Sequence, residues 1–176
     1  MGLVRRFAKD RQGVAAIEFA LIAPVLVLLY CGIAELGQAF LADSRTSHVA
    51  SAVGDLVAQT DTLTSANVDD IFTIGATIMA PFPTSSLQMR VTSVTADPTG
   101  KPLVTWSRSY GGYPILKPTN PVTVPIVMAA GDSVIMTQSQ YQYTSVIQYI
   151  LPHALTYTAA YYLKPRRSTQ VTCPSC

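Results

Sequence analysis

The chain has 176 residues, of which 49% are hydrophobic and 12% are charged. Residues 1–11 carry a net charge of +3, Glu18 carries −1, and the eight basic and eight acidic residues from Glu35 onward balance, which gives the chain its net charge of +2. A near-neutral surface lacks the basic stripe that nucleic-acid binding needs, which excludes nucleic acid as a partner. With an apolar segment near the front, the length leaves room for one modest domain behind it.

The first segment is a basic head, residues 1–13, which is followed by the apolar segment Val14 to Ala34. This segment is about as long as the ~20 residues that a helix needs to cross ~30 Å of hydrocarbon, which predicts a transmembrane helix over residues 14–34. Basic residues precede the span and only Arg45 follows it closely. The positive-inside rule therefore places the N-terminus in the cytoplasm and everything after Ala34 outside.

Glu18 is the one charged residue within this apolar segment. An unpaired charged carboxylate costs on the order of 2 to 3 kcal/mol or more inside lipid, so an intramembrane acid is a functional candidate. The alternative is that Glu18 sits near one end of the span and reaches the headgroups.

A secretory signal peptide has a similar layout. Two small-x-small sites, Gly32-Ile33-Ala34 and Gly37-Gln38-Ala39, offer cleavage positions for it. Against this interpretation, the apolar run is long for the core of a signal peptide, and Glu18 interrupts it. An ordinary secreted protein starting at Glu35 or Phe40 remains an alternative.

The helical period continues beyond the membrane without a breaker, which predicts an amphipathic stalk helix over residues 35–60. The apolar residues of its stripe are Leu36, Phe40, Val49, Val53, Leu56 and Val57. After a polar break, Ser65 or Asn67 caps a second short helix that holds Asp69 and Asp70 in its first turn.

From Leu87 the period changes to two, which indicates strands. The first begins at Leu87, the turn Asp97 to Gly100 leads to a second over 103–110, and extended segments follow over 132–147 and 155–163. In the second strand Val104, Trp106 and Tyr110 are expected to share a face. The prolines of residues 111–131 exclude a central strand there, and this long loop is expected to serve partner contact.

Two helices followed by about four strands, without βαβ alternation, predict an α+β domain with an antiparallel sheet over residues 61–176. The apolar stripe of the stalk helix is expected to cover one face of that sheet.

The sequence offers little catalytic chemistry. His48 and His153 belong to no metal or nucleophile motif and are expected to be structural or solvated. Cys173 and Cys176 form a terminal CxxC, and pairing in an oxidising compartment explains it better than redox or metal chemistry, since nearby ligands for zinc are missing. We therefore expect no enzyme activity, no cofactor, no metal and no small-molecule substrate.

The stretch RRFAKDRQGVAAIEFALIAPVLVLLYCGIAELGQAF, residues 5–40, resembles the N-terminus of the TadE-like family, the pseudopilins or minor pilins of the tight-adherence (Tad/Flp) pilus system. The likeness rests on the basic head, Gly13, the run from Val14 to Ala20, and Gly32 followed by Glu35-Leu36-Gly37. Weaker likeness extends to residues 130–133, 141–143, 164–167 and Thr172-Cys173.

The resemblance implies a pilin-like fold and cleavage by a prepilin peptidase between Gly13 and Val14. Glu18 then becomes the fifth mature residue, and Phe19 follows it, as in many TadE-like members. Cleavage leaves a positive amino group on Val14, and an opposite charge nearby makes a carboxylate tolerable in a low-dielectric setting. In a helical stack, Glu18 of one subunit is expected to neutralise the Val14 amine of its neighbour.

The function that follows is that of a minor pilin or pseudopilin of a Tad-type type IV pilus, acting in pilus assembly, surface adhesion or biofilm formation. Its expected partners are the inner membrane, the prepilin peptidase, other pilin subunits and Tad assembly proteins. It would be a single-pass inner-membrane protein with a periplasmic domain, and would enter the extracellular pilus after processing. The alternative is an uncut scaffold of the same apparatus that stays anchored in the membrane.

Overall fold

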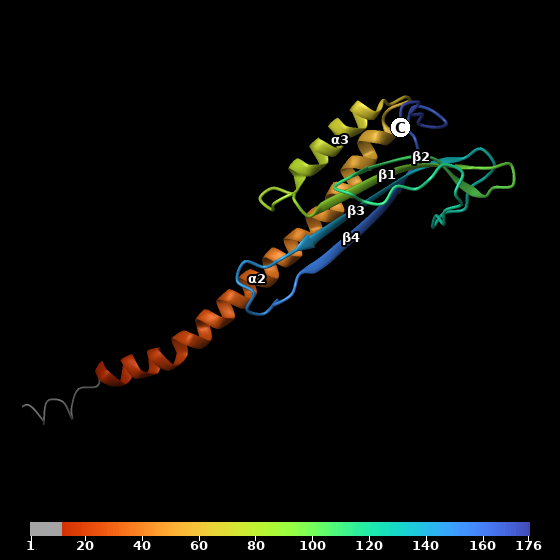
Figure 1. Cartoon of the computed structure of the whole chain (residues 1–176). Helices are drawn as coiled ribbons and strands as arrows, with labels where there is room; N and C mark the ends of the chain where they lie inside the picture. The colour runs from red at the N-terminus through yellow and green to blue at the C-terminus, as the bar shows by residue number, and fades with distance from the viewer. Residues whose placement is uncertain (1–11) are drawn as a thin grey trace, which may run out of the picture.

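A long N-terminal helix leads into a domain of one further helix and one sheet, and the computed structural model describes residues 12–176 (Figure 1). Helix α2 spans Gln12–Ala58 and helix α3 spans Ser65–Ile78. The strands are β1 (Leu87–Ala96), β2 (Pro102–Tyr110), β3 (Ser133–Tyr143) and β4 (Leu155–Leu163). They form an antiparallel sheet in the order β2-β1-β3-β4. The predicted α+β class is confirmed.

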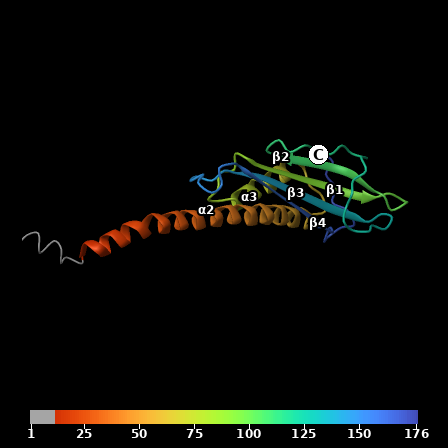
Figure 2. The same cartoon turned by 90° about the horizontal axis from the view of Figure 1, so that it is seen from below.

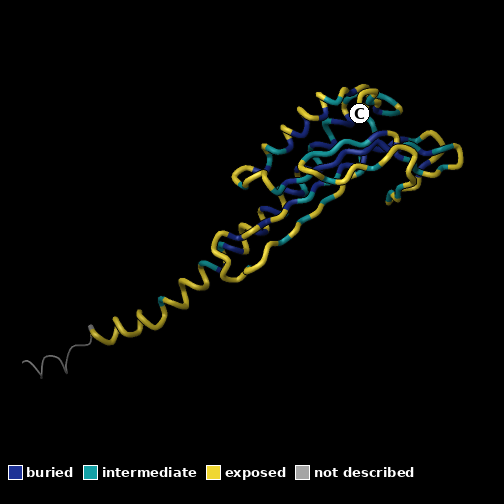
Figure 3. Tube along the Cα trace, in the orientation of Figure 1, coloured by how far each residue is buried: buried dark blue, intermediate teal, exposed yellow. Residues whose placement is uncertain are grey.

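Helix α2 has two parts with different surroundings. Residues 13–30 are almost entirely exposed, whereas from Gly32 onward one side of the helix is buried (Figure 3). The helix runs through Pro24 without interruption and curves in its N-terminal part (Figure 2), where the proline removes one backbone hydrogen bond. Of the predicted leader, residues 1–13, only Gln12 and Gly13 fall within the described residues, and both belong to this helix.

The buried side of α2 covers one face of the sheet, here called the inner face (Figure 2). Its buried residues recur every three or four positions: Glu35, Ala39, Ala42, Thr46, Val49, Val53 and Val57. The predicted stripe is correct for the three valines and wrong for Leu36 and Phe40, which are exposed. Small side chains occupy the inner positions instead, because an interior at crystal-like density leaves no room for larger ones where helix and sheet approach closely.

Helix α2 approaches the sheet closely at Gly54. A Cβ atom there would lie 2.7 Å from Oγ1 of Thr137 in β3 and 2.8 Å from Cδ1 of Leu163 in β4. Nearer the N-terminal end of α2, the Ser139 hydroxyl donates a hydrogen bond of 2.7 Å to the backbone carbonyl of Thr46. Helix and sheet therefore form one packed unit.

Helix α3 begins with a capping box at Thr64, whereas the sequence predicted Ser65 or Asn67 as the cap. The Asn67 amide donates to the Thr64 hydroxyl at 3.2 Å, and the Thr64 amide donates to Oδ1 of Asn67 at 3.0 Å. Two backbone donors that would otherwise lack partners are satisfied in this way. The helix packs beside α2 and over β2, with the rings of Phe72 and Tyr110 6.1 Å apart.

A bulge in β2 changes which side chains reach the inner face. Ser93 pairs with Trp106, but the next residue, Val94, pairs with Val104, so β2 has one extra residue. Residues directly opposite each other share a face, which puts Trp106 and Val104 on opposite sides of the sheet. The prediction that Val104 shares a face with Trp106 and Tyr110 is therefore wrong.

Residues 111–131 fold back over the outer face of the sheet. Arg90 anchors this segment: Nη1 donates to the Pro114 carbonyl at 2.5 Å, and the guanidinium lies 4.7 Å from the centre of the Tyr113 ring. Within this range the structure forms only an isolated bridge between Leu103 and Pro121, as the prolines predict.

The C-terminal tail, residues 164–176, crosses the C-terminal end of α2. The indole N–H of Trp106 donates to the Val171 carbonyl at 2.9 Å, and the Arg166 amide donates to the Ala58 carbonyl at 2.8 Å. These bonds join the tail to both layers of the domain.

Candidate functional site at the exposed helix and its junction with the domain

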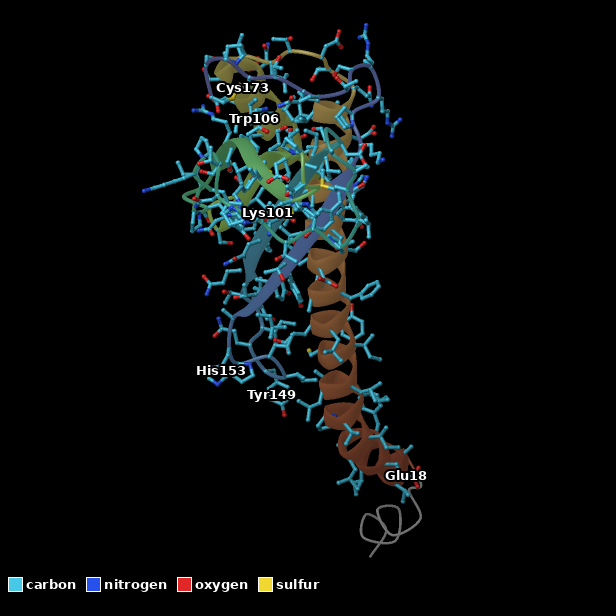
Figure 4. All side chains as sticks on the ribbon, turned by 90° about the vertical axis from the view of Figure 1, so that its right-hand side faces the viewer. Glu18, Lys101, Trp106, Tyr149, His153 and Cys173 are labelled. Atoms are coloured by element: carbon cyan, nitrogen blue, oxygen red, sulfur yellow. A yellow bond between two sulfur atoms is a disulfide. The ribbon has the colours of Figure 1, made fainter. Side chains whose placement is uncertain are left out.

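The predicted assembly residues lie at the free end of α2. Glu18 is exposed there, far from the domain (Figure 4). Val14 and Phe19 are 55% and 70% exposed, and no atom lies within 4 Å of the Cβ position of Gly13. The structure thus brings these four residues together on one short stretch of bare helix. An apolar surface with a single carboxylate is suited to lipid or to other helices.

Helix α2 is also long and apolar enough to cross a membrane, judged by its length and composition. Among the described helices it is the one with this property, and its most apolar window is not buried by the rest of the protein. Single-pass membrane anchoring is the arrangement that these features support.

Glu35 marks the junction where the exposed part of α2 meets the domain. Only 2% of its surface is accessible, and its Oε2 accepts a hydrogen bond of 2.7 Å from the backbone amide of Ile150. Gly32, one turn earlier, faces the Ile150 side chain, and a Cβ atom at Gly32 would collide with it. These contacts hold the loop of residues 144–154 against the helix. The sequence predicted that the third strand continues to Ile147, whereas β3 ends at Tyr143 and the chain enters this loop.

Glu35 is absent from the residues that sequence reasoning selected as a site. The sequence contains a signal for it, because Gly32 and Glu35 are three positions apart and therefore lie on the same face of a helix. Gly32 has no side chain, so another segment can approach the helix there and donate a hydrogen bond to the carboxylate of Glu35.

A cavity of about 670 Å³ opens beside this junction, between α2, the residues that follow α3, and the loop 144–154. Phe82, Tyr141 and Tyr143 contribute to its lining, and Glu35 is the one charged residue among the lining residues, all of which are described. Burial raises the pKa of Tyr141, whose hydroxyl donates to the Pro83 carbonyl at 3.0 Å. The lining therefore combines aromatic and apolar side chains with hydroxyl and amide groups and one carboxylate.

Residues 13–55 match the family model described as TadE-like protein. This segment of the chain is similar to the TadE-like family. The match confirms the resemblance inferred from the sequence, and it begins at Gly13 and includes both Glu18 and Glu35. The matched segment covers the exposed part of α2 and the first part of its buried stripe. No curated protein and no solved structure matches the chain.

The other residues singled out from the sequence lie away from the exposed part of α2. Cys173 and Cys176 are joined by a disulfide at the far end of the domain from Glu18 (Figure 4). Cys173 packs against the domain core, so the bridge closes the tail next to the end of α2. His48 lies on the exposed side of α2 and His153 in the loop 144–154. The two histidines therefore share no site.

Proposed function

We propose that the protein is a minor pilin or pseudopilin of a Tad-type type IV pilus. The observation that carries this proposal is the bare apolar surface of residues 13–30 with Glu18 as its single carboxylate, in a segment that matches the TadE-like family model. A surface of this kind is stable in lipid before assembly and against neighbouring helices after it.

The proposed mechanism begins with cleavage between Gly13 and Val14 by a prepilin peptidase. The new amino group of Val14 then lies at the membrane boundary, close to the level of Glu18. In the assembled stack, Glu18 of one subunit pairs with the Val14 amine of the next. Such a pair fixes the register of neighbouring helices more than it adds stability, because both charges must be removed from water.

Before assembly, the proposed arrangement is a single pass through the inner membrane with the N-terminus in the cytoplasm and the domain in the periplasm. The basic residues ahead of the span support this orientation through the positive-inside rule. After processing, the subunit takes its place among other pilins and Tad assembly proteins.

N-terminal sequencing of the mature protein tests the processing step. The proposal predicts a start at Val14, and Gly13→Leu should abolish cleavage because the bulky side chain occupies the position that glycine leaves open. Gly37→Leu is the matched control, since Gly37 is also a helical glycine with no neighbour within 4 Å of its Cβ position. A start at Met1 in the parent chain would indicate the uncut scaffold instead, and a start at Glu35 or Phe40 an ordinary secreted protein.

Substitution of Glu18 tests the assembly step. Glu18→Gln removes the charge while keeping the size, and should reduce piliation although the protein still reaches the membrane fraction. Glu18→Asp keeps the charge and should retain part of the assembly. Normal piliation by Glu18→Gln would contradict the proposed pairing with Val14.

A further inference from the structure

The loop between β3 and β4, residues 144–154, presents an apolar tip at the end of the domain that faces the membrane segment. Val146 is 98% exposed, Tyr149 is 59% exposed, and Ile147 and Ile150 are also exposed. Tyr149 and His153 lie beside α2 on the side of the domain toward Glu18 (Figure 4). Exposed apolar side chains that gather in this way on a soluble surface mark an interaction site.

The contacts of this loop fix its level along the helix. Ile150 bonds to Glu35 through its amide and packs against Gly32 through its side chain. At about 1.5 Å per residue, the span from Val14 to Ala34 is about 30 Å long, which equals the thickness of the hydrocarbon layer. The loop therefore meets the helix at the boundary of the membrane on the domain side.

The helix surface stays apolar on both sides of this level. Tyr30 and Ile33 are exposed before it, and Leu36 and Phe40 are exposed after it. Glu35 is the only charged residue between Phe19 and Ala42, and the loop covers it. The loop thus removes the one charge that would interrupt an apolar surface at this depth.

We propose that the tip of this loop, residues 146–150, inserts into the membrane leaflet on the domain side and gives the protein a second contact with lipid. This proposal rests on the proposed membrane-spanning state of α2. The backbone of the loop stays at headgroup depth, because irregular backbone cannot satisfy its polar groups in hydrocarbon, and the apolar side chains reach inward. Tyr149 suits the interface, where an aromatic ring with a polar end is favoured.

The composition of the loop indicates which kind of lipid it contacts. Residues 144–154 contain no Asp, Glu, Lys or Arg. Insertion therefore depends on apolar burial at the interface and does not require anionic headgroups. With α2 as the first contact and the loop as the second, two contacts at the same membrane level limit the tilt of the domain relative to the bilayer.

Fluorescence quenching by brominated lipid tests the proposal on the full chain in phosphatidylcholine vesicles. Tyr149→Trp should lose emission when lipids carry bromine near the carbonyl end of their acyl chains, and should lose less with bromine near the chain end. The parent chain gives the background, because its Trp106 is 5% exposed and lies inside the domain.

Two further variants separate the possible failures. Val127→Trp places an indole at another exposed position that holds an apolar residue, next to Met128 and Gly100 at the opposite end of the sheet, and should not be quenched. Leu26→Trp lies in the proposed span and should be quenched by bromine near the chain ends. If Leu26→Trp is quenched but Tyr149→Trp, like Val127→Trp, is not, the loop does not contact lipid. The loop proposal is then overturned, whereas the proposed membrane span is supported.

Two other results would also overturn the proposal. Unquenched Leu26→Trp would show that the chain does not span the bilayer, and the proposed function would fail together with the loop contact. A blue-shifted but unquenched Tyr149→Trp would show that a second copy of the chain, and not lipid, covers the loop.

Discussion

The carboxylate of Glu35 and the backbone amide of Ile150, 115 positions apart in the chain, are joined by a hydrogen bond of 2.7 Å. This bond connects the point where α2 leaves its bare N-terminal part with the loop between β3 and β4. The remaining oxygen, Oε1, is buried and has no hydrogen-bond partner within the described part of the chain. The junction therefore depends on one carboxylate that is withdrawn from water.

Glu35→Ala should release the loop 144–154 from the helix. The substitution leaves the Ile150 amide without its acceptor, and a buried or half-buried donor without a partner favours opening. Hydrogen exchange of the full chain in detergent should become several-fold faster across residues 147–151. Gln38→Ala is the matched control, because Gln38 is exposed on the next turn of the same helix and should leave exchange unchanged. Unaltered exchange in Glu35→Ala would show that the loop is held by other contacts.

Thr64→Ala should destabilise the domain through the loss of the α3 capping box. Removal of a Thr cap typically costs about 1 kcal/mol. Thermal unfolding of the full chain in detergent, followed by Trp106 fluorescence, should show a lower Tm. Ser65→Ala is the control, since the sequence predicted Ser65 or Asn67 as the cap while the structure assigns the cap to Thr64. An equal loss of Tm in both variants would contradict this assignment.

Three features of the fold were not predicted correctly from the sequence: the cap of α3, the bulge in β2 and the set of α2 residues that are buried against the sheet. The element types follow from periods of 3.6 and 2 in the apolar residues, and these periods give both helices and all four strands correctly. The bulge opposite Ser93 and Val94 depends on how two strands pair, which the pattern of one strand does not contain. Likewise, Ala39 and Ala42 are buried while Phe40 is exposed, because the sheet approaches the helix too closely for a large ring.

Part of the candidate site could be predicted from the sequence and part could not. Gly13 and Glu18 are recognisable from local spacing and from the basic head, because their proposed roles depend on position along one helix. The partner of Glu35, the amide of Ile150, lies 115 positions away in the sequence and contacts Glu35 only in the folded protein. A local pattern can indicate that an acid at the end of an apolar run needs a partner, but it does not identify a partner so distant in the chain.

The β1–β2 turn should lose stability in acid. Oδ1 of Asp97 accepts hydrogen bonds from the Thr99 hydroxyl at 2.6 Å and from the Lys101 amide at 3.0 Å, and these bonds, that of the Thr99 hydroxyl most strongly, hold the pKa of Asp97 below its usual value. Because the folded state favours the carboxylate, its contribution is fully present above the unfolded pKa. It is lost as the pH falls through the lower folded pKa.

Asp97→Asn isolates this contribution, since an amide keeps an acceptor oxygen but does not titrate. The variant should have a lower Tm than the parent at pH 7, and the difference should narrow as the medium is made acidic enough to protonate the parent carboxyl. A difference in Tm that stays constant over the same range would show that the charge of Asp97 contributes nothing to the turn.

The contact at Gly54 gives the sharpest test of how closely α2 packs on the sheet. In Gly54→Ala the new methyl group meets Oγ1 of Thr137 and Cδ1 of Leu163 at distances below 3 Å. Overpacking of this kind costs about 1–3 kcal/mol, and the Tm of the full chain in detergent should fall. Gly37→Ala is the matched control: open space surrounds its Cβ position, and alanine is favoured over glycine in a helix by up to about 1 kcal/mol, so its Tm should not fall.

A double-mutant cycle then identifies the clash as the cause. Thr137→Ala removes the hydroxyl that the new methyl group meets, and Oγ1 of Thr137 is buried without a hydrogen-bond partner among residues 12–176, so its removal breaks no hydrogen bond. Thr137→Ala should therefore recover part of the stability lost in Gly54→Ala, with a coupling of about 0.5–3 kcal/mol between the two sites. Additive effects of the two substitutions would place the cost of Gly54→Ala elsewhere, in Leu163 or in the helix itself.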